Sequence, residues 1–210
     1  MPNWCNNFLT ITGEEVQLNK IKYLLEETKE TEQGMFITLV GLPEGITPEE
    51  HEKDWWDIHI SHWGCKWDVT YEDHSAMYDK NSITMSIETA WSPPISFCEK
   101  LAVMFNVEVQ IFYAEPGVGF AGLCTCLPDG TSQDDELSYM EGMYKYDNSG
   151  FWDEVESNIE SELEDIDWEE EPDTDHMVQE VLQEYPYISE EDVKTLKDLI
   201  TEKIQDYGEA

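Results

Sequence analysis

In residues 1 to 113, hydrophobic side chains recur first at every second position and then at every third or fourth, and this alternation of periods repeats. A period of two is typical of a strand with one buried face, and a period near 3.6 is typical of an amphipathic helix. Taken in order, the segments predict strand, helix, strand, strand, helix and strand. In that order, two helices cover one face of an antiparallel sheet. The sequence therefore predicts an α+β, ferredoxin-like domain.

The individual elements rest on short local patterns. Leu9 and Ile11 alternate with polar neighbours and the pattern stops at Gly13, which is typical of a strand. Ser92 precedes two prolines and can cap a helix whose first turn tolerates proline. Residues 35–40 read as a short extended piece before a turn. The remaining expectations are strands at 4–12, 67–71, 83–91 and 107–113, helices at 16–25, 48–63 and 98–105, and an extra edge strand at 120–127.

Beyond Gly130 the sequence becomes acidic and its apolar residues fall on helical stripes. Apolar residues from Trp152 to Ile166 are separated by three or four positions, which predicts an amphipathic helix. Further stripes predict a short helix at 177–185 and a last helix with Ser189 as its cap. We therefore expect a ferredoxin-like domain at residues 1–128 and a C-terminal acidic helical module at residues 129–210.

The charge of the chain is large and unevenly distributed. The 48 Asp and Glu face 11 Lys and no Arg, for a formal net charge of −37. Residues 129–210 hold 28 acids and 4 Lys, whereas residues 1–128 hold 20 acids and 7 Lys. By surface scaling, the second module carries one net charge per about 160 Å², and duplex DNA carries one per about 110 Å². Solubility alone needs a net charge of only about 2 to 8. A generic acidic surface of the halophile kind is the alternative explanation.

The acids are densest between Asp153 and Asp175, where 13 acids and no Lys occur. Because the apolar stripe of the predicted helix must face a core, most of these carboxylates are expected to point outward. Direct binding of nucleic acid is excluded, since the chain has no basic cluster and no arginine to grip phosphate. The expected partner-binding acidic surface consists of Asp153, Glu154, Glu156, Glu160, Glu162, Glu164, Asp165, Asp167, Glu169, Glu170 and Glu171.

The sequence also bears on location. The longest purely apolar run, Leu101 to Phe105, is far too short to span a bilayer, and no signal peptide is recognisable. Five cysteines in a chain of this length favour reduced thiols over a disulfide framework. We therefore expect a protein of the host-cell cytoplasm that does not interact with membranes.

Five residues are candidate metal ligands, since His and Cys are the usual zinc ligands: His59, His62, Cys65, Cys124 and Cys126. Their spacing matches no recognised two-pair zinc pattern. A strand that places Cys124 and Cys126 on one face explains the pair without a metal. The sequence therefore predicts no metal and no other cofactor.

No catalytic constellation is recognisable either. Cys98 belongs to a helical stripe and is expected to be a core thiol. Asp68, Asp73 and Glu88 can form an acid and base pair, but with 48 acids such proximity also arises by chance. Residues 117–122 match G-x-G-x-x-G, yet they lie between two predicted strands and are expected to form a glycine-rich hairpin. We therefore expect a protein that is not an enzyme, with no catalytic residues.

Four sequence blocks occur in a recognisable order. They are Pro2-Asn3-Trp4-Cys5-Asn6-Asn7, Trp63-Gly64-Cys65-Lys66-Trp67-Asp68, Thr89-Ala90-Trp91-Ser92-Pro93-Pro94, and Tyr113-Ala114-Glu115-Pro116-Gly117 followed by Phe120-Ala121-Gly122. In these blocks, residues 1 to 127 resemble the YubB-like ferredoxin-fold family, whose uncharacterised members are carried by phages, plasmids and genomic islands. Cys65 and His62 depart from the family pattern, which commonly has Thr and Asn there. The resemblance implies a ferredoxin-like fold and a mobile-element origin, but no activity.

The same blocks suggest a second kind of site. Their aromatic and charged residues can converge on a cleft that stacks a base or another ring, although Trp and Pro in such blocks also serve to hold loops in place. The candidate ligand cleft consists of Trp63, Lys66, Trp67, Asp68, Trp91 and Glu115.

Two functions follow as expectations. The first is a phage or mobile-element interaction protein that inhibits a host nucleic-acid-binding or defence protein, with its acidic surface mimicking DNA in the basic groove of that protein. The alternative is a protein that binds or sequesters a small ligand, such as a nucleotide or signalling molecule. The apolar stripes of the last helices can be buried within the chain or across a homodimer, and the sequence leaves both open.

Overall fold

The computed structural model describes residues 2–31, 33–70, 74–164 and 172–208. The chain divides into two compact units, Met1–Tyr139 and Met140–Ala210, and each is described by itself. The first unit continues past residue 128, the expected end of the first domain. The reason is a strand at Ser132–Ser138 that pairs with the preceding strand and so belongs to the same sheet.

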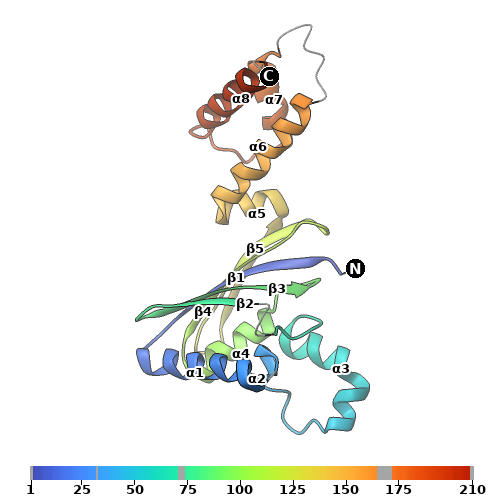
Figure 1. Ribbon diagram of the computed structural model, residues 1–210, viewed down its shortest axis with the longest axis vertical. Coiled ribbons are helices and arrows are strands. Elements are labelled where there is room, and N and C mark those ends of the chain that lie inside the picture. The colour runs from blue at the N-terminus through green and yellow to red at the C-terminus, as the bar shows by residue number, and fades with distance from the viewer. Residues whose placement is uncertain (1, 32, 71–73, 165–171, 209–210) are drawn as a thin grey trace. The chain divides into compact units, whose positions relative to one another are not determined.

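The first unit is a six-stranded antiparallel sheet with its helices packed on one face (Figure 1). The strands lie in the order β2-β3-β1-β4-β5-β6. The elements in chain order are β1 (Trp4–Thr12), α1 (Glu15–Thr31), α2 (Met35–Leu39), α3 (Pro48–Trp63), β2 (His74–Tyr78), β3 (Ser82–Ala90), α4 (Ile95–Phe105), β4 (Glu108–Glu115), β5 (Phe120–Cys126) and β6 (Ser132–Ser138). The predicted α+β, ferredoxin-like fold is confirmed.

The core lies between the sheet and the helices α1, α2 and α4. Leu9 and Ile11 of β1 are fully buried, as are Leu101 of α4 and Cys98 beside it. The alternate residues of β1 are more exposed, so the other face of this strand does not contribute to the core. Cys98 is therefore the core thiol that the helical stripe predicted, and burial raises its pKa.

Three local expectations were wrong. Residues 35–39 form the helix α2 rather than an extended piece, and β2 begins at His74 rather than at Trp67. Ser92 is not the cap of α4, because Pro94 occupies the N-cap position and the Ser92 hydroxyl donates to the carbonyl of Gly64. In each case a contact with a segment distant in sequence outweighs the local pattern.

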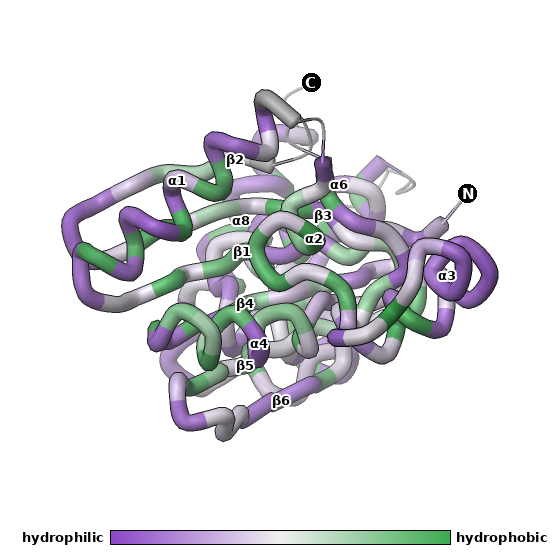
Figure 2. Tube along the Cα trace, turned by 90° about the horizontal axis from the view of Figure 1, so that it is seen from below, coloured by the Kyte–Doolittle hydropathy of each residue, from purple (hydrophilic) through white to green (hydrophobic). Residues whose placement is uncertain are grey.

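The sixth strand, β6, was not expected from the sequence. Its residues are hydrophilic, as the purple colour of β6 in Figure 2 shows, and they lack the alternation that predicts a half-buried strand. The strand forms because β5 offers it a complete hydrogen-bonding edge along the register Phe120↔Ser138 to Cys126↔Ser132. The hairpin expected between β4 and β5 is confirmed, with Gly119 at a positive φ of 96° in its turn.

The second unit is helical. Its elements are α5 (Tyr139–Tyr146), α6 (Asn148–Glu164), α7 (Thr174–Glu184) and α8 (Val193–Gly208). Of the predicted stripe, Val155, Ile159 and Leu163 are buried, Trp152 is half-buried and Ile166 lies outside the described residues. Phe151, which was not in that stripe, is buried and contacts the rings of Tyr144, Tyr185 and Tyr187. Apolar residues of α7 and α8 are also buried. The helix α5 was not expected. The expected helical C-terminal module is confirmed. None of the described helices combines the length and apolar character needed to cross a bilayer.

Candidate functional site

The exposed side of α6 carries a group of carboxylates. Phe151, Val155, Ile159 and Leu163 are buried along one side of this helix. The stripe leaves the remaining positions facing away from the core. Exposed carboxylates on those positions belong to Asp153, Glu154, Glu162 and Glu164, and half-buried ones belong to Glu156 and Glu160.

Lys203 of α8 neutralises part of this group. Its ammonium forms ion pairs with both Glu156 and Glu160. The hydrogen bonds to Glu156 and Glu160 hold the pKa of Lys203 above its ordinary value. These two carboxylates are therefore engaged within the chain, and the four exposed ones on α6 have no such partner among the described residues.

The acidic group continues onto α7. Partial burial raises the pKa of Glu162, and the negative charges of Glu180 and Glu184 raise it further. Burial and the nearby Glu184 and Glu154 raise the pKa of Tyr185 to about 12. Like charges on α6 and α7 therefore lie close enough to interact. We call the exposed set Asp153, Glu154, Glu162, Glu164, Glu180 and Glu184 the acidic surface.

The acidic surface differs in membership from the set expected from the sequence. Asp165, Asp167, Glu169, Glu170 and Glu171 lie outside the described residues. Glu180 and Glu184 were not in that set, although a helix at 177–185 was predicted. Their positions relative to α6 depend on how the two helices pack, and the sequence carries no signal for that.

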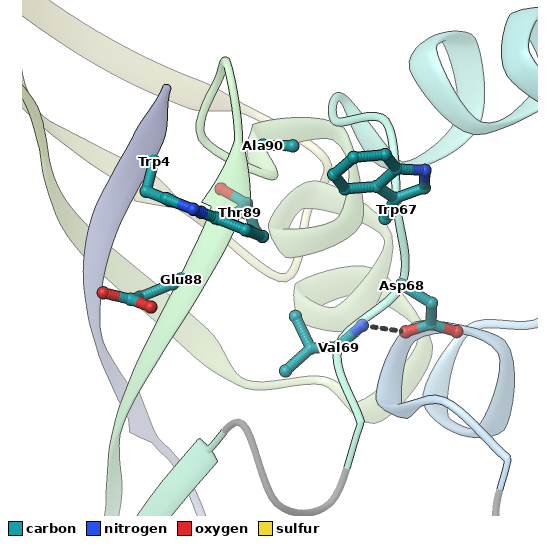
Figure 3. Close-up of a pocket in the computed structure, with 7 residues that line it drawn as sticks. All are labelled: Trp4, Trp67, Asp68, Val69, Glu88, Thr89 and Ala90. Carbon is teal, nitrogen blue, oxygen red and sulfur yellow. Dashed lines mark hydrogen bonds between the residues drawn. The ribbon is translucent and has the colours of Figure 1, made fainter. Parts of the chain in front are cut away.

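A separate pocket lies in the first unit, between two tryptophans. The ring centroids of Trp4 and Trp67 are 6.2 Å apart, and the planes are inclined by 46°. Both side chains are partly exposed, by 46% for Trp4 and 39% for Trp67. The cavity has a volume of about 280 Å³ and is lined by Trp4, Trp67, Asp68, Val69, Glu88, Thr89 and Ala90 (Figure 3). We call it the indole pocket.

Two walls of the indole pocket come from neighbouring strands, with Trp4 on β1 and residues 88–90 on β3. In the register of this strand pair, Trp4 lies opposite Ala90, and Asn6 lies opposite Glu88. Directly opposed residues share a face of the sheet, so Trp4 and Glu88 are diagonal neighbours on the face not covered by helices. Diagonal neighbours on a sheet are about 7–8 Å apart, which an aromatic or long side chain can span.

The third wall comes from the segment between α3 and β2, which Asp68 anchors. One carboxylate oxygen of Asp68 accepts from the backbone N–H of Phe36 at 2.6 Å and of Val69 at 2.7 Å, and the other accepts from Ile37 at 3.0 Å. Figure 3 shows this carboxylate turned away from the space between the indoles. Burial raises the pKa of Asp68, and the three N–H groups oppose that shift. Asp68 therefore holds α2 and positions Trp67.

The candidate cleft residues divide into two groups. Trp67 and Asp68 line the indole pocket, and the Lys66 ammonium lies 4.2 Å from the centroid of the Trp67 ring. The other three candidates do not line it. Trp63 is buried and donates to the Gly41 carbonyl, Trp91 is exposed at a positive φ of 74°, and buried Glu115 accepts from the N–H groups of Gly117 and Val118.

Five of the seven lining residues were not among the cleft candidates, and two of these five, Trp4 and Glu88, carry an aromatic or charged side chain. Trp4 lies in the first block of the resemblance, and Glu88 was considered only as one carboxylate of a chance pair. The alternation in β1 and β3 contained a signal, because it places Trp4 and Glu88 on the polar faces of their strands. The register that makes the two residues neighbours could not be read from either strand alone.

The residues considered for a metal are not brought together as one set. The imidazoles of His51 and His59 are 2.9 Å apart between their Nε2 atoms, and Nδ1 of His59 lies 2.9 Å from the Lys66 carbonyl oxygen. Cys124 and Cys126 are buried with their sulfur atoms 3.8 Å apart, on one face of β5 as expected. Within the described ranges, no three His, Cys, Asp or Glu side chains gather as metal ligands would.

Comparison with known proteins identifies a family. The model described as "Ferredoxin-like domain in Api92-like protein" matches residues 66–177, from the pocket segment through α6 into α7. This match runs beyond residue 127, where the resemblance based on sequence blocks ended. A crystal structure of protein api92 from Yersinia pseudotuberculosis is similar, with 11% identity and a TM-score of 0.46 over 66% of this chain and 99% of that chain. No curated protein matches the chain.

Proposed function

This chain belongs to the Api92-like family of ferredoxin-like domain proteins, and we propose that it is a non-enzymatic interaction protein whose acidic surface occupies the basic nucleic-acid-binding groove of a partner protein. The resemblance of residues 1–127 to the YubB-like family adds a phage or other mobile element as its origin. On that basis the partner is a host nucleic-acid-binding or defence protein, and binding inhibits it in the cytoplasm of the host.

The observation that carries this proposal is the exposed carboxylate set on α6 and α7. At a rise of about 1.5 Å per residue, the four exposed acids from Asp153 to Glu164 span about 16.5 Å, so successive charges are separated by about 5.5 Å of helix axis on average. One strand of DNA carries a charge every 3.4 Å or so of axis. The ion pairs of Lys203 take only Glu156 and Glu160 out of the acidic group.

The electrostatics favour a binding role over a purely solubilising one. Burial raises the pKa of Glu162, and the negative charges of Glu180 and Glu184 add to that shift, so these three carboxylates repel one another. Such repulsion costs stability in the free protein and is relieved when a cationic surface covers the carboxylates. The expected association is fast and steered by charge, and it weakens steeply as salt screens the interaction.

The test combines a pull-down with competition by DNA. The immobilised full chain is incubated with host lysate at low salt, and bound proteins are eluted with duplex DNA and then with high salt. We expect the DNA to release nucleic-acid-binding proteins. Bound proteins that are indifferent to both DNA and salt would overturn the proposal.

Matched charge variants make the test specific to the acidic surface. The first variant carries Glu154→Gln, Glu162→Gln, Glu180→Gln and Glu184→Gln, which removes four charges from that surface. The control removes four charges from exposed positions of the first unit with Glu14→Gln, Glu26→Gln, Glu49→Gln and Glu108→Gln. Because both variants have the same net charge, loss of partner binding in the first alone supports the acidic surface. Equal loss in both would attribute binding to overall charge.

The indole pocket supports a second candidate function, binding of a small ligand by the first unit. A cavity of about 280 Å³ lined by two indoles is close to the lower limit of size for small-molecule sites. The carboxylates of Asp68 and Glu88 in its lining disfavour a phosphate-bearing ligand such as a nucleotide. Thermal-shift measurements with nucleotides test this version directly, because a ligand that binds only the folded state raises the melting temperature.

A further inference from the structure

The polar groups of the indole pocket are almost all engaged within the chain. The carboxylate of Asp68 accepts from three backbone N–H groups. The hydroxyl of Thr89 donates to the Ser92 carbonyl at 2.7 Å and accepts from the Asn7 amide at 2.9 Å. Glu88 is exposed and has no hydrogen bond or ion pair within the described part of the chain. The pocket therefore offers a ligand one free negative charge and two aromatic surfaces.

Aromatic surfaces next to a carboxylate form an environment suited to cations. The face of an indole carries negative electrostatic potential and attracts a positive charge within about 6 Å of its centroid. This protein already shows the interaction, since the Lys66 ammonium lies 4.2 Å from the Trp67 centroid. A cation that contacts both Trp4 and Trp67 from the angle between their rings also gains Coulomb energy from Glu88. An anion is repelled both by the faces of the indoles and by the carboxylate of Glu88.

We propose that the indole pocket binds a quaternary ammonium group, with Trp4 and Trp67 contacting its methyl groups and Glu88 balancing its charge. This inference rests on the second candidate function and names the ligand class for it. It concerns residues of the first unit only, so it stands or falls independently of the acidic surface.

The shortage of free acceptors selects a quaternary ammonium among organic cations. A guanidinium brings five N–H donors and a primary ammonium brings three, and each donor buried without an acceptor costs free energy. Only Glu88 has a free side-chain acceptor among the groups above. A quaternary ammonium has no N–H to satisfy, and its methyl groups pack against the indole rings. The pocket therefore favours a quaternary ammonium both through its indole rings and Glu88 and through its shortage of hydrogen-bond acceptors for N–H groups.

In the experiment, the full chain is titrated with choline chloride. Binding is monitored by the indole Nε1–H signals of the eight tryptophans in two-dimensional NMR spectra. We expect the Trp4 and Trp67 signals to shift and saturate. The neutral alcohol 3,3-dimethylbutan-1-ol has nearly the same shape without the charge, and we expect it to bind at least about fivefold more weakly. Equal shifts with the alcohol, or shifts confined to other tryptophans, would overturn the proposal.

Charge variants distinguish binding in the indole pocket from nonspecific binding of choline to the protein surface. Glu88→Gln keeps the shape of an exposed side chain and is expected to weaken choline binding about threefold to tenfold. Glu108→Gln removes an exposed strand carboxylate outside the pocket lining and is expected to leave binding unchanged. Lys66→Gln removes the competing charge over Trp67 and is expected to strengthen choline binding. Weaker choline binding after Lys66→Gln, or no change after Glu88→Gln, would overturn the assignment to a cation.

The quaternary ammonium can belong to a free small molecule or to a trimethylated lysine of a protein. A short peptide containing trimethyl-lysine distinguishes these sources when titrated beside choline. Tighter binding of the peptide supports the site with a protein side chain as ligand, and tighter binding of choline supports it with a small molecule. Failure of both cations would overturn the inference, and it would leave the pull-down result unaffected.

Discussion

The two units of this protein hold themselves together in different ways. The first joins strands far apart in sequence, such as β1 with β4, and its core lies between sheet and helices. The second packs consecutive helices whose exposed sides are crowded with carboxylates. Among its described residues, Lys197 pairs with Asp175, and Lys203 pairs with Glu156 and Glu160. The stability of the first unit therefore depends mainly on pairing between distant strands. In the second unit, repulsion between carboxylates opposes the stability that the packing of the helices provides.

The largest expected effect tests whether the second unit depends on its aromatic core. Phe151→Ala removes a fully buried ring that contacts Tyr144, Tyr185 and Tyr187. We expect it to lower the free energy of unfolding of the second unit by about 3–5 kcal/mol. Hydrogen exchange resolved by residue measures this, with α6 and α8 amides losing protection while β1 and β4 amides keep it. Equal loss in both units would show that they unfold together.

A smaller effect is expected from the anchor of the pocket segment in the first unit. Asp68→Ala leaves the N–H groups of Phe36 and Ile37 without their acceptor, so we expect a loss of about 1–3 kcal/mol. Chemical denaturation followed by near-UV circular dichroism measures it. Glu108→Ala, at an exposed carboxylate on β4, serves as the control. An effect on the second unit in place of the first would contradict the assigned role.

Salt should change the stability of the two units unequally. Raising the salt concentration screens the repulsion between Glu162, Glu180 and Glu184, and so should stabilise the second unit more than the first. Hydrogen exchange at low and high salt compares α7 amides with β4 amides in one sample. A larger gain in the first unit would overturn the electrostatic contrast.

Protonation of His59 in the first unit and of Glu162 in the second should have opposite effects on stability. Burial, aided by the facing His51, holds the pKa of His59 below its ordinary 6.5, so the unfolded chain binds the proton more readily. The first unit should therefore lose stability as the pH falls below about 6.5, until the pH passes the lower pKa of the folded state. The penalty is absent at higher pH.

The carboxyl of Glu162 has the opposite linkage. Its pKa lies above the ordinary 4.5 in the folded protein, so the folded state binds the proton more readily. The second unit should gain stability as the pH falls through that raised pKa toward 4.5, and Glu162→Gln should remove this gain. Hydrogen exchange between about pH 7.5 and pH 5 measures both trends, after correction for the intrinsic exchange rate. A parallel trend in the two units would contradict the contrast.

Much of the fold could be predicted because its signals are local. The alternation around Leu9 and Ile11 and the stripe from Trp152 to Ile166 each mark an element within one short segment. The helix α2 could not be predicted in this way, because its first N–H groups are satisfied by Asp68, which lies far along the chain. The polar strand β6 carries no periodic signal and forms on the edge of β5.

The candidate sites show the same division. The acids of α6 were expected to be exposed, because an apolar stripe fixes which side of a helix faces the core. That Lys203 neutralises Glu156 and Glu160, and that α7 adds Glu180 and Glu184, depends on the packing of three helices. Trp67 was a cleft candidate, but its partner Trp4 was not.

By itself, the sequence determined the strand-helix-strand-strand-helix-strand order of the ferredoxin-like part, the concentration of negative charge in the C-terminal part, and the side of the main amphipathic elements that faces a core. These properties follow from the period of the side chains and from composition, which need no partner. The tertiary structure decided which side chains meet, including Trp4 with Trp67 and Asp68 with the start of α2. Those contacts depend on strand register and loop closure, which join residues distant in sequence and leave no local pattern.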